Sequence, residues 1–280
     1  MIRDSGTRTK NPNLEDWTDT RVGGSGDRTY RDVDNLRFFA DVLGKLEAEG
    51  IGHQGKMAIG LLGQRDLPGV TLRRAQSILR WDLRPSLWSH AFLFADALTP
   101  DPEVLKAAPI REVSIHSRTG VFPDPAVNAV GESALRYYVR ADVDANAGLV
   151  VVEMDEAEVE AVAHRALVDP NQDRMRYDLW RMLGIWESYM WSAGALPNPL
   201  RQGHPVFSSA FVEYCYEAIR LDLAPGASER NSAPEHIWNA AKWWYENFES
   251  LGRTIRCYCV LRDQGAAVLD REPNVPMFAD

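Results

Sequence analysis

Apolar side chains recur at helical spacing in several stretches of the chain. The first covers residues 33–49, where the pattern stops just before Gly50, a residue typical of the end of a helix. This pattern predicts an amphipathic helix that packs on the outside of the main domain. Further helices are predicted over residues 71–79, 155–167, 177–191 and 208–219, and from Pro234 onward.

Other stretches are typical of β-strands. Residues 91–95 are apolar throughout, which suits a strand that is covered on both faces. Residues 110–115, 135–143 and 254–261 are predicted to be further strands. Together the helices and strands predict an α+β fold.

Composition divides the chain into parts. Residues 1–31 are rich in Gly, Ser, Thr, Asp and Arg and have hardly any apolar periodicity, so burial cannot offset the entropy of ordering them. They are predicted to be a flexible leader. Residues 32–79 are predicted to form a helical N-terminal extension, residues 80–262 the main domain, and residues 263–280 a surface tail.

Charge and hydropathy exclude some classes of protein. The formal net charge is -9 at pH 7, and no block of Lys and Arg is long enough to follow a phosphate backbone, so nucleic acid is not an expected partner. No apolar run approaches the roughly 20 residues that a membrane-spanning helix needs. Residues 1–34 lack the apolar segment of a signal peptide, which favours a cytoplasmic protein and leaves open export by another route.

The three cysteines show neither metal-site spacing nor an even disulfide framework. Cys215 is predicted to be packed rather than reactive, and Cys257 and Cys259 share one side of a predicted strand. The sequence also shows no phosphate-cradling glycine loop, no cluster of metal-ligand residues and no internal repeat. We therefore expect neither a metal nor a cofactor.

Ser208 falls where a short approach over residues 205–207 gives way to a helix. Two interpretations of its hydroxyl stay open. Serine is a preferred N-cap, because its oxygen accepts a hydrogen bond from an unpaired amide of the first turn. The same amides and the positive end of the helix dipole also stabilise an anion, which helps an ionised nucleophile or an oxyanion.

Residues 207–212, Phe-Ser-Ser-Ala-Phe-Val, resemble the nucleophile motif of the circularly permuted papain-like hydrolases related to the NlpC cell-wall peptidases. In that family a Cys-Ser pair opens a buried helix, and a histidine and then an acid precede it along the chain. Residues 88–94, Trp-Ser-His-Ala-Phe-Leu-Phe, resemble the family's serine-histidine and the strand that follows. Residues 110–115 with 119–121 resemble the next strand and turn, and residues 176–179 resemble the Tyr-Asp before the nucleophile segment.

The resemblance covers about residues 80–262 and implies a permuted papain-like catalytic domain, with an antiparallel sheet or small barrel packed by the nucleophile helix. It implies that Ser208 is the nucleophile, His90 the general base and Glu112 the acid that orients His90. The predicted substrate-binding residues are Tyr177, Ser209 and His204.

Each of these residues also has a purely structural interpretation. The alternative for His90 is a buried histidine that bonds to backbone, and the alternative for Glu112 is a solvated acid or a partner of the adjacent Arg111. The alternative for His204 is an ordinary loop residue. His116 lies two steps of two from Glu112 along the strand and is the fallback member of the site.

Ser208 stands where the family has cysteine, so the thiolate chemistry of a histidine-paired cysteine does not transfer directly. A natural serine nucleophile, a natural loss of activity and an engineered exchange that silences the enzyme all stay open. We expect a hydrolase that acts by acyl transfer on a peptide, an acyl-amide or a thioester. The alternatives are a catalytically dead module that binds a peptide or acyl chain, and a scaffold in which Ser208 only caps its helix.

Overall fold

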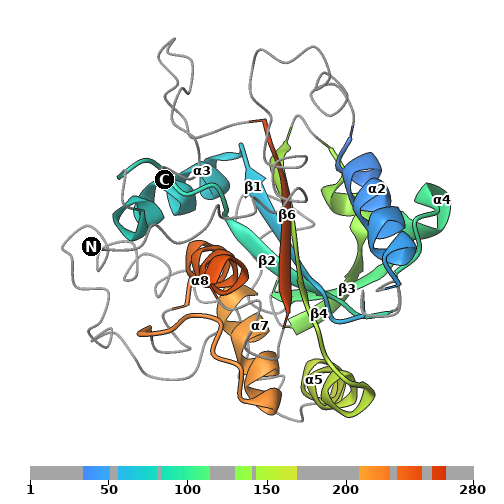
Figure 1. The fold of residues 1–280 in the computed structure, drawn as a ribbon. Helices are drawn as coiled ribbons and strands as arrows, with labels where there is room; N and C mark the ends of the chain where they lie inside the picture. The colour runs from blue at the N-terminus through green and yellow to red at the C-terminus, as the bar shows by residue number, and fades with distance from the viewer. Residues whose placement is uncertain are drawn as a thin grey trace, which may run out of the picture.

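The structure is a computed structural model, and it describes residues 34–50, 56–80, 83–96, 98–113, 130–140, 143–168, 208–227, 232–247 and 254–262. The strands of this part of the chain form one sheet in the order β4-β3-β2-β1-β5-β6, with every pairing antiparallel (Figure 1). The prediction of an α+β fold with an antiparallel sheet is confirmed. The strands are β1 (Ile59–Gln64), β2 (His90–Phe94), β3 (Pro109–Val113), β4 (Val130–Ala134), β5 (Asp144–Val152) and β6 (Ile255–Leu261).

Capping carboxylates begin the first two helices that the structure describes. α2 (Asn35–Ala48) follows Asp34, whose side chain accepts a hydrogen bond from the Arg37 N–H at 3.1 Å. α3 (Leu67–Ala75) follows Asp66, which caps its helix in the same way. The structure also describes α4 (Pro102–Leu105), α5 (Glu156–Val168), α7 (Ser208–Tyr216), α8 (Pro234–Asn247) and the 3-10 helices η3 (Gln76–Leu79), η4 (Leu135–Tyr138) and η6 (Glu217–Ile219).

α2 covers one face of the sheet (Figure 1). Phe38 and Phe39 of α2 are fully buried and belong to one cluster with Phe92 and Phe94 of β2. The ring centroids of Phe39 and Phe94 lie 5.8 Å apart in an edge-to-face arrangement. We call this cluster the α2-side core. It also includes Leu36, Val42, Leu43, Leu46, Leu62, Ile110, Leu135, Tyr138, Leu149 and Val151.

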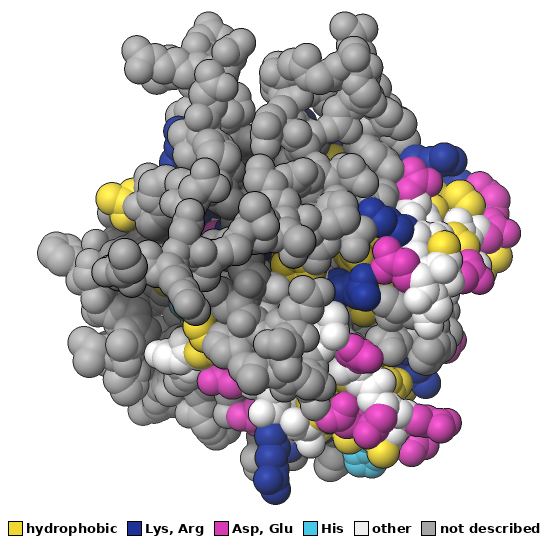
Figure 2. All heavy atoms as spheres, in the orientation of Figure 1, with side chains coloured by type: hydrophobic (Ala, Val, Ile, Leu, Met, Phe, Trp, Pro, Cys, Tyr) yellow, Lys and Arg dark blue, Asp and Glu magenta, His cyan; other side chains and the backbone are white. Residues whose placement is uncertain are grey.

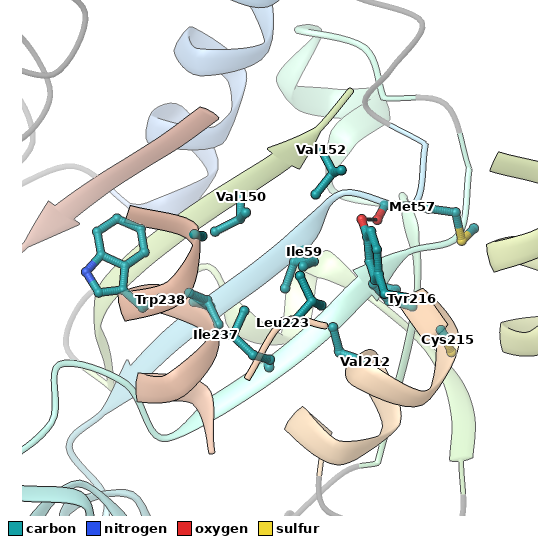
Figure 3. Packing of buried hydrophobic residues seen from close by; sticks show 14 of the residues in the cluster. Met57, Ile59, Val150, Val152, Val212, Cys215, Tyr216, Leu223, Ile237 and Trp238 are labelled. Carbon is teal, nitrogen blue, oxygen red and sulfur yellow. Dashed lines mark hydrogen bonds between the residues drawn. The ribbon is translucent and has the colours of Figure 1, made fainter. Parts of the chain in front are cut away.

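α7 and α8 cover the opposite face (Figure 1). In Figure 3, Ile59 of β1 and Val150 of β5 lie on the sheet surface that faces Val212 of α7. The Tyr216 hydroxyl donates to the Met57 carbonyl at 2.7 Å, which connects α7 to the segment just before β1. We call this cluster the α7-side core. It also includes Leu61, Ala91, Leu93, Val113, Val152, Cys215, Ile237, Trp238, Cys257 and Cys259.

β2 is buried along its whole length, as its unbroken apolar run predicts. Ala91 and Leu93 belong to the α7-side core, whereas Phe92 and Phe94 belong to the α2-side core. Successive side chains of a strand point to opposite faces, so one strand serves both cores. The prediction of a strand covered on both faces is confirmed.

β1 lies between β2 and β5, inside the sheet. The predicted boundary at residues 79/80 therefore separates two strands that pair directly, with Leu62 opposite His90. α2 packs on the same sheet that β1 forms with the later strands. The sequence Ile-Gly-Leu-Leu-Gly-Gln is too short and too lacking in alternation to indicate this pairing in advance.

β5 is the longest strand of the described residues and was not predicted. Its first half reads Asp-Ala-Asn-Ala-Gly, and residues of these types are poor strand formers. The neighbouring Trp88 explains the glycine at position 148, because a Cβ atom there would lie 2.8 Å from the Trp88 ring. The strand predicted over residues 135–143 is wrong at each of its described positions, since residues 135–138 form η4, residues 139, 140 and 143 belong to no strand, and β5 begins at Asp144.

The helices predicted over residues 33–49, 155–167 and 208–219 and from Pro234 onward are confirmed by α2, α5, α7 and α8. The acidic side chains of α5 face solvent, as their spacing predicts. Figure 2 shows them gathered over this helix, and Glu156 and Glu160 are exposed. No helix in the described part of the chain is long and apolar enough to cross a membrane.

Several sequence predictions lie outside the described residues. They are the leader over residues 1–31, the tail over residues 263–280, the helix over residues 177–191, and the side chains of Tyr177, His204 and His116.

Candidate functional site

The ladder between β2 and β3 stops short of the first residues of β2. It pairs Leu93 with Arg111 and Phe94 with Ile110, and beyond these pairs the Ala95 N–H donates to the Pro109 carbonyl. Backbone N–H groups two residues apart in a strand point the same way, so the Ala91 N–H also points toward β3. It donates to the Ser208 hydroxyl oxygen at 3.3 Å instead of to a strand.

Ser208 is the first residue of α7 and is only 6% exposed. α7 lies against both β2 and β3, so its first residue reaches the point where the ladder between the two strands ends. The structure therefore places the predicted nucleophile beside the strand position that follows His90.

His90 and Glu112 contact each other directly. The Nε2 atom of His90 lies 2.7 Å from Oε2 of Glu112, and the two side chains are 1% and 3% exposed. The other ring nitrogen of His90, Nδ1, is also buried and has no hydrogen-bond partner among the described residues. The Ser208 hydroxyl thus does not bond to His90 in this structure, although it bonds to the next residue of the strand.

Glu112 accepts two further hydrogen bonds that the sequence did not indicate. The Ser133 hydroxyl of β4 donates to Oε1 at 2.5 Å, and the Tyr138 hydroxyl of η4 donates to Oε2 at 2.6 Å. With His90, three donors therefore surround one buried carboxyl group. The pairing of β3 with β4, which sets Ser133 opposite Ile110, brings Ser133 to Glu112.

The balance of burial and hydrogen bonding decides the charge of Glu112. Burial raises the pKa of this carboxyl, but the hydrogen bond and charge of His90 and the hydroxyls of Ser133 and Tyr138 together hold it below the ordinary value. An ionised carboxylate can only accept, so we assign the proton of neutral His90 to Nε2. Its Nδ1 then carries a lone pair that can take a proton.

Aromatic rings surround the imidazole. The ring centroid of Tyr138 lies 5.4 Å from that of His90 and 6.0 Å from that of Phe92, on which it is stacked with an interplanar angle of 13°. Phe92 and Tyr138 belong to the α2-side core. The His90 ring therefore lies on the α2 side of the sheet, and Ser208 approaches the same strand end from the α7 side.

A second buried carboxyl group is that of Asp144, the first residue of β5. The side-chain amide of Gln64 donates to Oδ1 of Asp144 at 3.2 Å, and the Ser89 hydroxyl donates to the side-chain oxygen Oε1 of Gln64 at 3.4 Å. Burial raises the pKa of Asp144 to about 7, more than the Gln64 hydrogen bond and the charge of His90 lower it. Gln64 and Asp144 were not predicted, because the strands β1 and β5 that carry them were not.

The remaining predicted residues have structural contacts. The Ser209 hydroxyl donates to the Ser232 carbonyl at 2.8 Å and so ties α7 to the segment before α8. Cys215, Cys257 and Cys259 are all buried and form no disulfide among the described residues, as expected for packed thiols. Burial raises the pKa of Cys259 to about 12, so this thiol is not a nucleophile at neutral pH.

Among the described residues, no group of three or more His, Cys, Asp and Glu side chains is placed to hold a metal ion. No protein-family model, curated protein or solved structure shows significant similarity to the chain. A function is therefore inferred from the geometry of the chain's own residues. These residues form a buried acid, an imidazole with one free nitrogen, and a hydroxyl at a helix start.

Proposed function

We propose that the chain is a permuted papain-like hydrolase that cleaves amide or thioester bonds by acyl transfer, with its centre where β2, β3 and α7 meet. One observation supports this above all. His90 is buried, an acid holds its Nε2, and its Nδ1 has no partner among the described residues, while the first side chain of α7 lies beside the next residue of the strand. An unpaired buried nitrogen is costly, so its retention favours a catalytic role over a packing role.

The reaction would use these groups in two halves. His90 Nδ1 takes the proton from the side chain of residue 208, whose oxygen, or sulfur in a cysteine form, bonds to the substrate carbonyl carbon. Backbone amides at the start of α7 stabilise the oxyanion. His90 returns the proton to the departing amine or thiolate as the bond to it breaks. Water, deprotonated by His90, then releases the acid and restores residue 208.

In this structure Ser208 bonds to Ala91 and the His90 ring lies on the other face of β2, so the cycle requires residue 208 and Nδ1 of His90 to come within hydrogen-bond reach when substrate binds. Catalytic hydrogen bonds are often long or misdirected in a free enzyme and tighten when substrate binds. The Ala91 N–H is itself a donor to the side-chain oxygen of residue 208, so it favours the ionised form of that side chain. A thiolate would gain more from this arrangement than an alkoxide, because a thiol ionises far more readily.

The test is to make Ser208→Cys and treat it with a thiol-directed acyl electrophile. Labelling of residue 208 is expected, and it should fall at least about tenfold when His90→Ala is added, because the base is lost. Ser209→Cys is the matched control, since its side chain is the next on the same helix and points to Ser232. Labelling at residue 208 that is insensitive to His90, or no faster than at residue 209, contradicts the proposal.

A second candidate is a papain-like module that binds a peptide or acyl chain without cleaving it. The serine at position 208 and its hydrogen bond to Ala91 instead of His90 favour this alternative. The natural chain and its His90→Ala variant would then bind an N-acyl peptide equally well by calorimetry, and Ser208→Cys would not be labelled. Slow release of product from such a peptide, lost in His90→Ala, would favour the enzyme.

A further inference from the structure

We propose that Tyr138 is a positioning residue of the site, which holds Glu112 ionised and the His90 ring in place through its hydroxyl. This inference rests on the hydrolase function proposed above and adds a residue to it. Tyr138 does not adjoin the residues that the sequence singles out, and it lies 26 positions after Glu112. It acts through Glu112 and not on the substrate.

The first step concerns how a buried carboxylate stays charged. Glu112 is 3% exposed, so protein donors must replace the water that would stabilise its charge. The Tyr138 hydroxyl and His90 Nε2 share Oε2, at 2.6 and 2.7 Å, while Ser133 occupies Oε1. The Tyr138 hydrogen bond lowers the pKa of Glu112. Its removal therefore raises that pKa.

The second step concerns orientation. Because both groups meet at Oε2, the phenol fixes that oxygen at the point where the imidazole N–H arrives. The Tyr138 ring also lies 5.4 Å from the His90 ring and is stacked on Phe92. An imidazole held at Nε2 and along its ring has little freedom to turn, so its Nδ1 keeps a fixed direction.

The third step concerns what holds Tyr138 itself. The Asn35 side chain donates to the Tyr138 carbonyl at 3.2 Å, and the Asn35 N–H donates to the Val139 carbonyl at 2.9 Å. Asn35 is the first residue of α2 and is fully buried. The start of α2 thus sets the position of η4, and through Tyr138 it sets the position of the acid.

Loss of the hydroxyl should change the pH dependence of reactivity. A Glu112 carboxyl with a raised pKa is protonated at a higher pH, and a protonated carboxyl no longer requires the His90 proton on Nε2. The base is then lost on the acid side of the profile. Since one good hydrogen bond to a charged group is worth about one pH unit, the acid limb should move up by about that amount.

The experiment measures the labelling rate of the Ser208→Cys protein against pH, with and without Tyr138→Phe. The substitution keeps the ring and removes only the hydroxyl. We expect the acid limb to shift upward by about one pH unit, with about tenfold slower labelling on that limb and little change on the plateau. Ser133→Ala should shift the same limb in the same direction, and Ser133→Thr, which keeps a hydroxyl, should restore it.

The outcomes separate the two proposals. If the parent Ser208→Cys protein shows no labelling that depends on His90, the hydrolase proposal fails. If the parent is labelled but Tyr138→Phe leaves the limb unmoved, only the role of Tyr138 is overturned. Nitrogen-15 spectra of the His90 ring give a readout that needs no turnover, because they report which ring nitrogen carries the proton. A Tyr138→Phe ring whose proton stays on Nε2 at every pH where the parent's does also overturns the role.

Circular dichroism tests whether Tyr138→Phe is folded. If this variant does not fold, 3-fluorotyrosine at position 138 tests the same point, because its hydroxyl is a stronger donor and its ring is of nearly the same size. The acid limb should then move to lower pH. A limb that stays in place or moves upward with this residue contradicts the inference.

Discussion

Two buried carboxyl groups near His90 show how strongly local donors decide charge. Glu112 receives three side-chain donors, and its pKa lies below the ordinary value even though burial raises it. Among the described residues, Asp144 receives one side-chain donor, from Gln64, and burial raises its pKa to about 7. Both side chains are almost inaccessible to water. The number of donors therefore separates an ionised acid from one that is protonated over much of the acid range.

Asp144→Asn should make the stability less dependent on pH. The folded protein binds the Asp144 proton more tightly than the unfolded chain, because its pKa rises from 3.8 to about 7. Wild-type stability from this group is full at low pH and declines as pH rises from about 4 to about 7. The asparagine keeps an acceptor for Gln64 and cannot ionise. We expect the free energy of unfolding of the variant, relative to that of the wild type, to rise across this pH interval by on the order of a few kcal/mol, as measured by urea unfolding.

Asp41→Asn on α2 is the matched control, because its carboxyl is 27% exposed and pairs with Arg37 at the surface. Parallel unfolding curves at pH 4.5 and pH 8 compare both variants with the wild type. A difference between Asp144→Asn and the wild type that does not grow with pH would show that Asp144 ionises normally in the fold.

Among the helices, α8 is held by a carboxylate at its own start. Glu235 Oε2 accepts hydrogen bonds from the Ser86 hydroxyl at 2.6 Å and from the Leu87 N–H at 3.2 Å. Arg80 lies 3.6 Å from the other oxygen, yet burial dominates and raises the pKa of Glu235. Ser86 and Leu87 lead into β2, so this contact connects α8 to the strand that carries His90.

Glu235→Ala should destabilise the protein by about 2–4 kcal/mol, because it removes the acceptor of the buried Leu87 N–H, one acceptor of the Ser86 hydroxyl and the carboxylate that faces Arg80. Glu235→Gln keeps an acceptor for both donors and should cost clearly less. Urea unfolding measures both changes, with Glu160→Ala on the exposed face of α5 as control. An alanine variant that unfolds within about 0.5 kcal/mol of the wild type would exclude an anchoring role for Glu235.

Sequence periodicity predicted helices and fully apolar strands better than it predicted strands that contain small and polar residues. α2, α7 and β2 could be read in advance because their apolar positions repeat at the helical period or run without interruption. β5 could not, because its first residues are small and polar and its strand form depends on pairing with β1 and β6. Propensity is a weak guide where tertiary pairing decides the conformation.

The site was predictable in part for the same reason. His90, Glu112 and Ser208 could be singled out because motif order marks them, and the structure brings His90 to Glu112 and Ser208 to the adjacent Ala91. Ser133 and Tyr138 could not be found, because their role depends on how β4 pairs with β3 and on a 3-10 turn where a strand was expected. The register of β4 on β3 depends on the pairing of the strands in the folded protein, which cannot be derived from a single sequence.

At the scale of the whole molecule, the candidate site lies where the two cores meet across one sheet. Through Tyr138 and Asn35, Glu112 is connected to α2 on one face. Through Ser208, the end of β2 is connected to α7 on the other face. The relative placement of the acid and the residue at position 208 therefore depends on both layers being packed. A loss of packing on either face should therefore displace Glu112 relative to residue 208.

The same architecture predicts that the two cores unfold together. Phe38 is fully buried in the α2-side core, and Phe38→Ala should cost about 3–5 kcal/mol. The three cysteines, Cys215, Cys257 and Cys259, all lie in the α7-side core and report on the far face through their reactivity toward a thiol reagent.

Because β2 and β5 contribute side chains to both cores, we expect the urea midpoints measured by cysteine reactivity and by far-ultraviolet circular dichroism to fall by the same amount in Phe38→Ala. Val104→Ala, at an exposed position of α4, should shift neither. If Phe38→Ala lowers the dichroism midpoint while the cysteines stay protected at the wild-type concentration, the two faces unfold separately, and the site cannot depend on α2 in the way proposed.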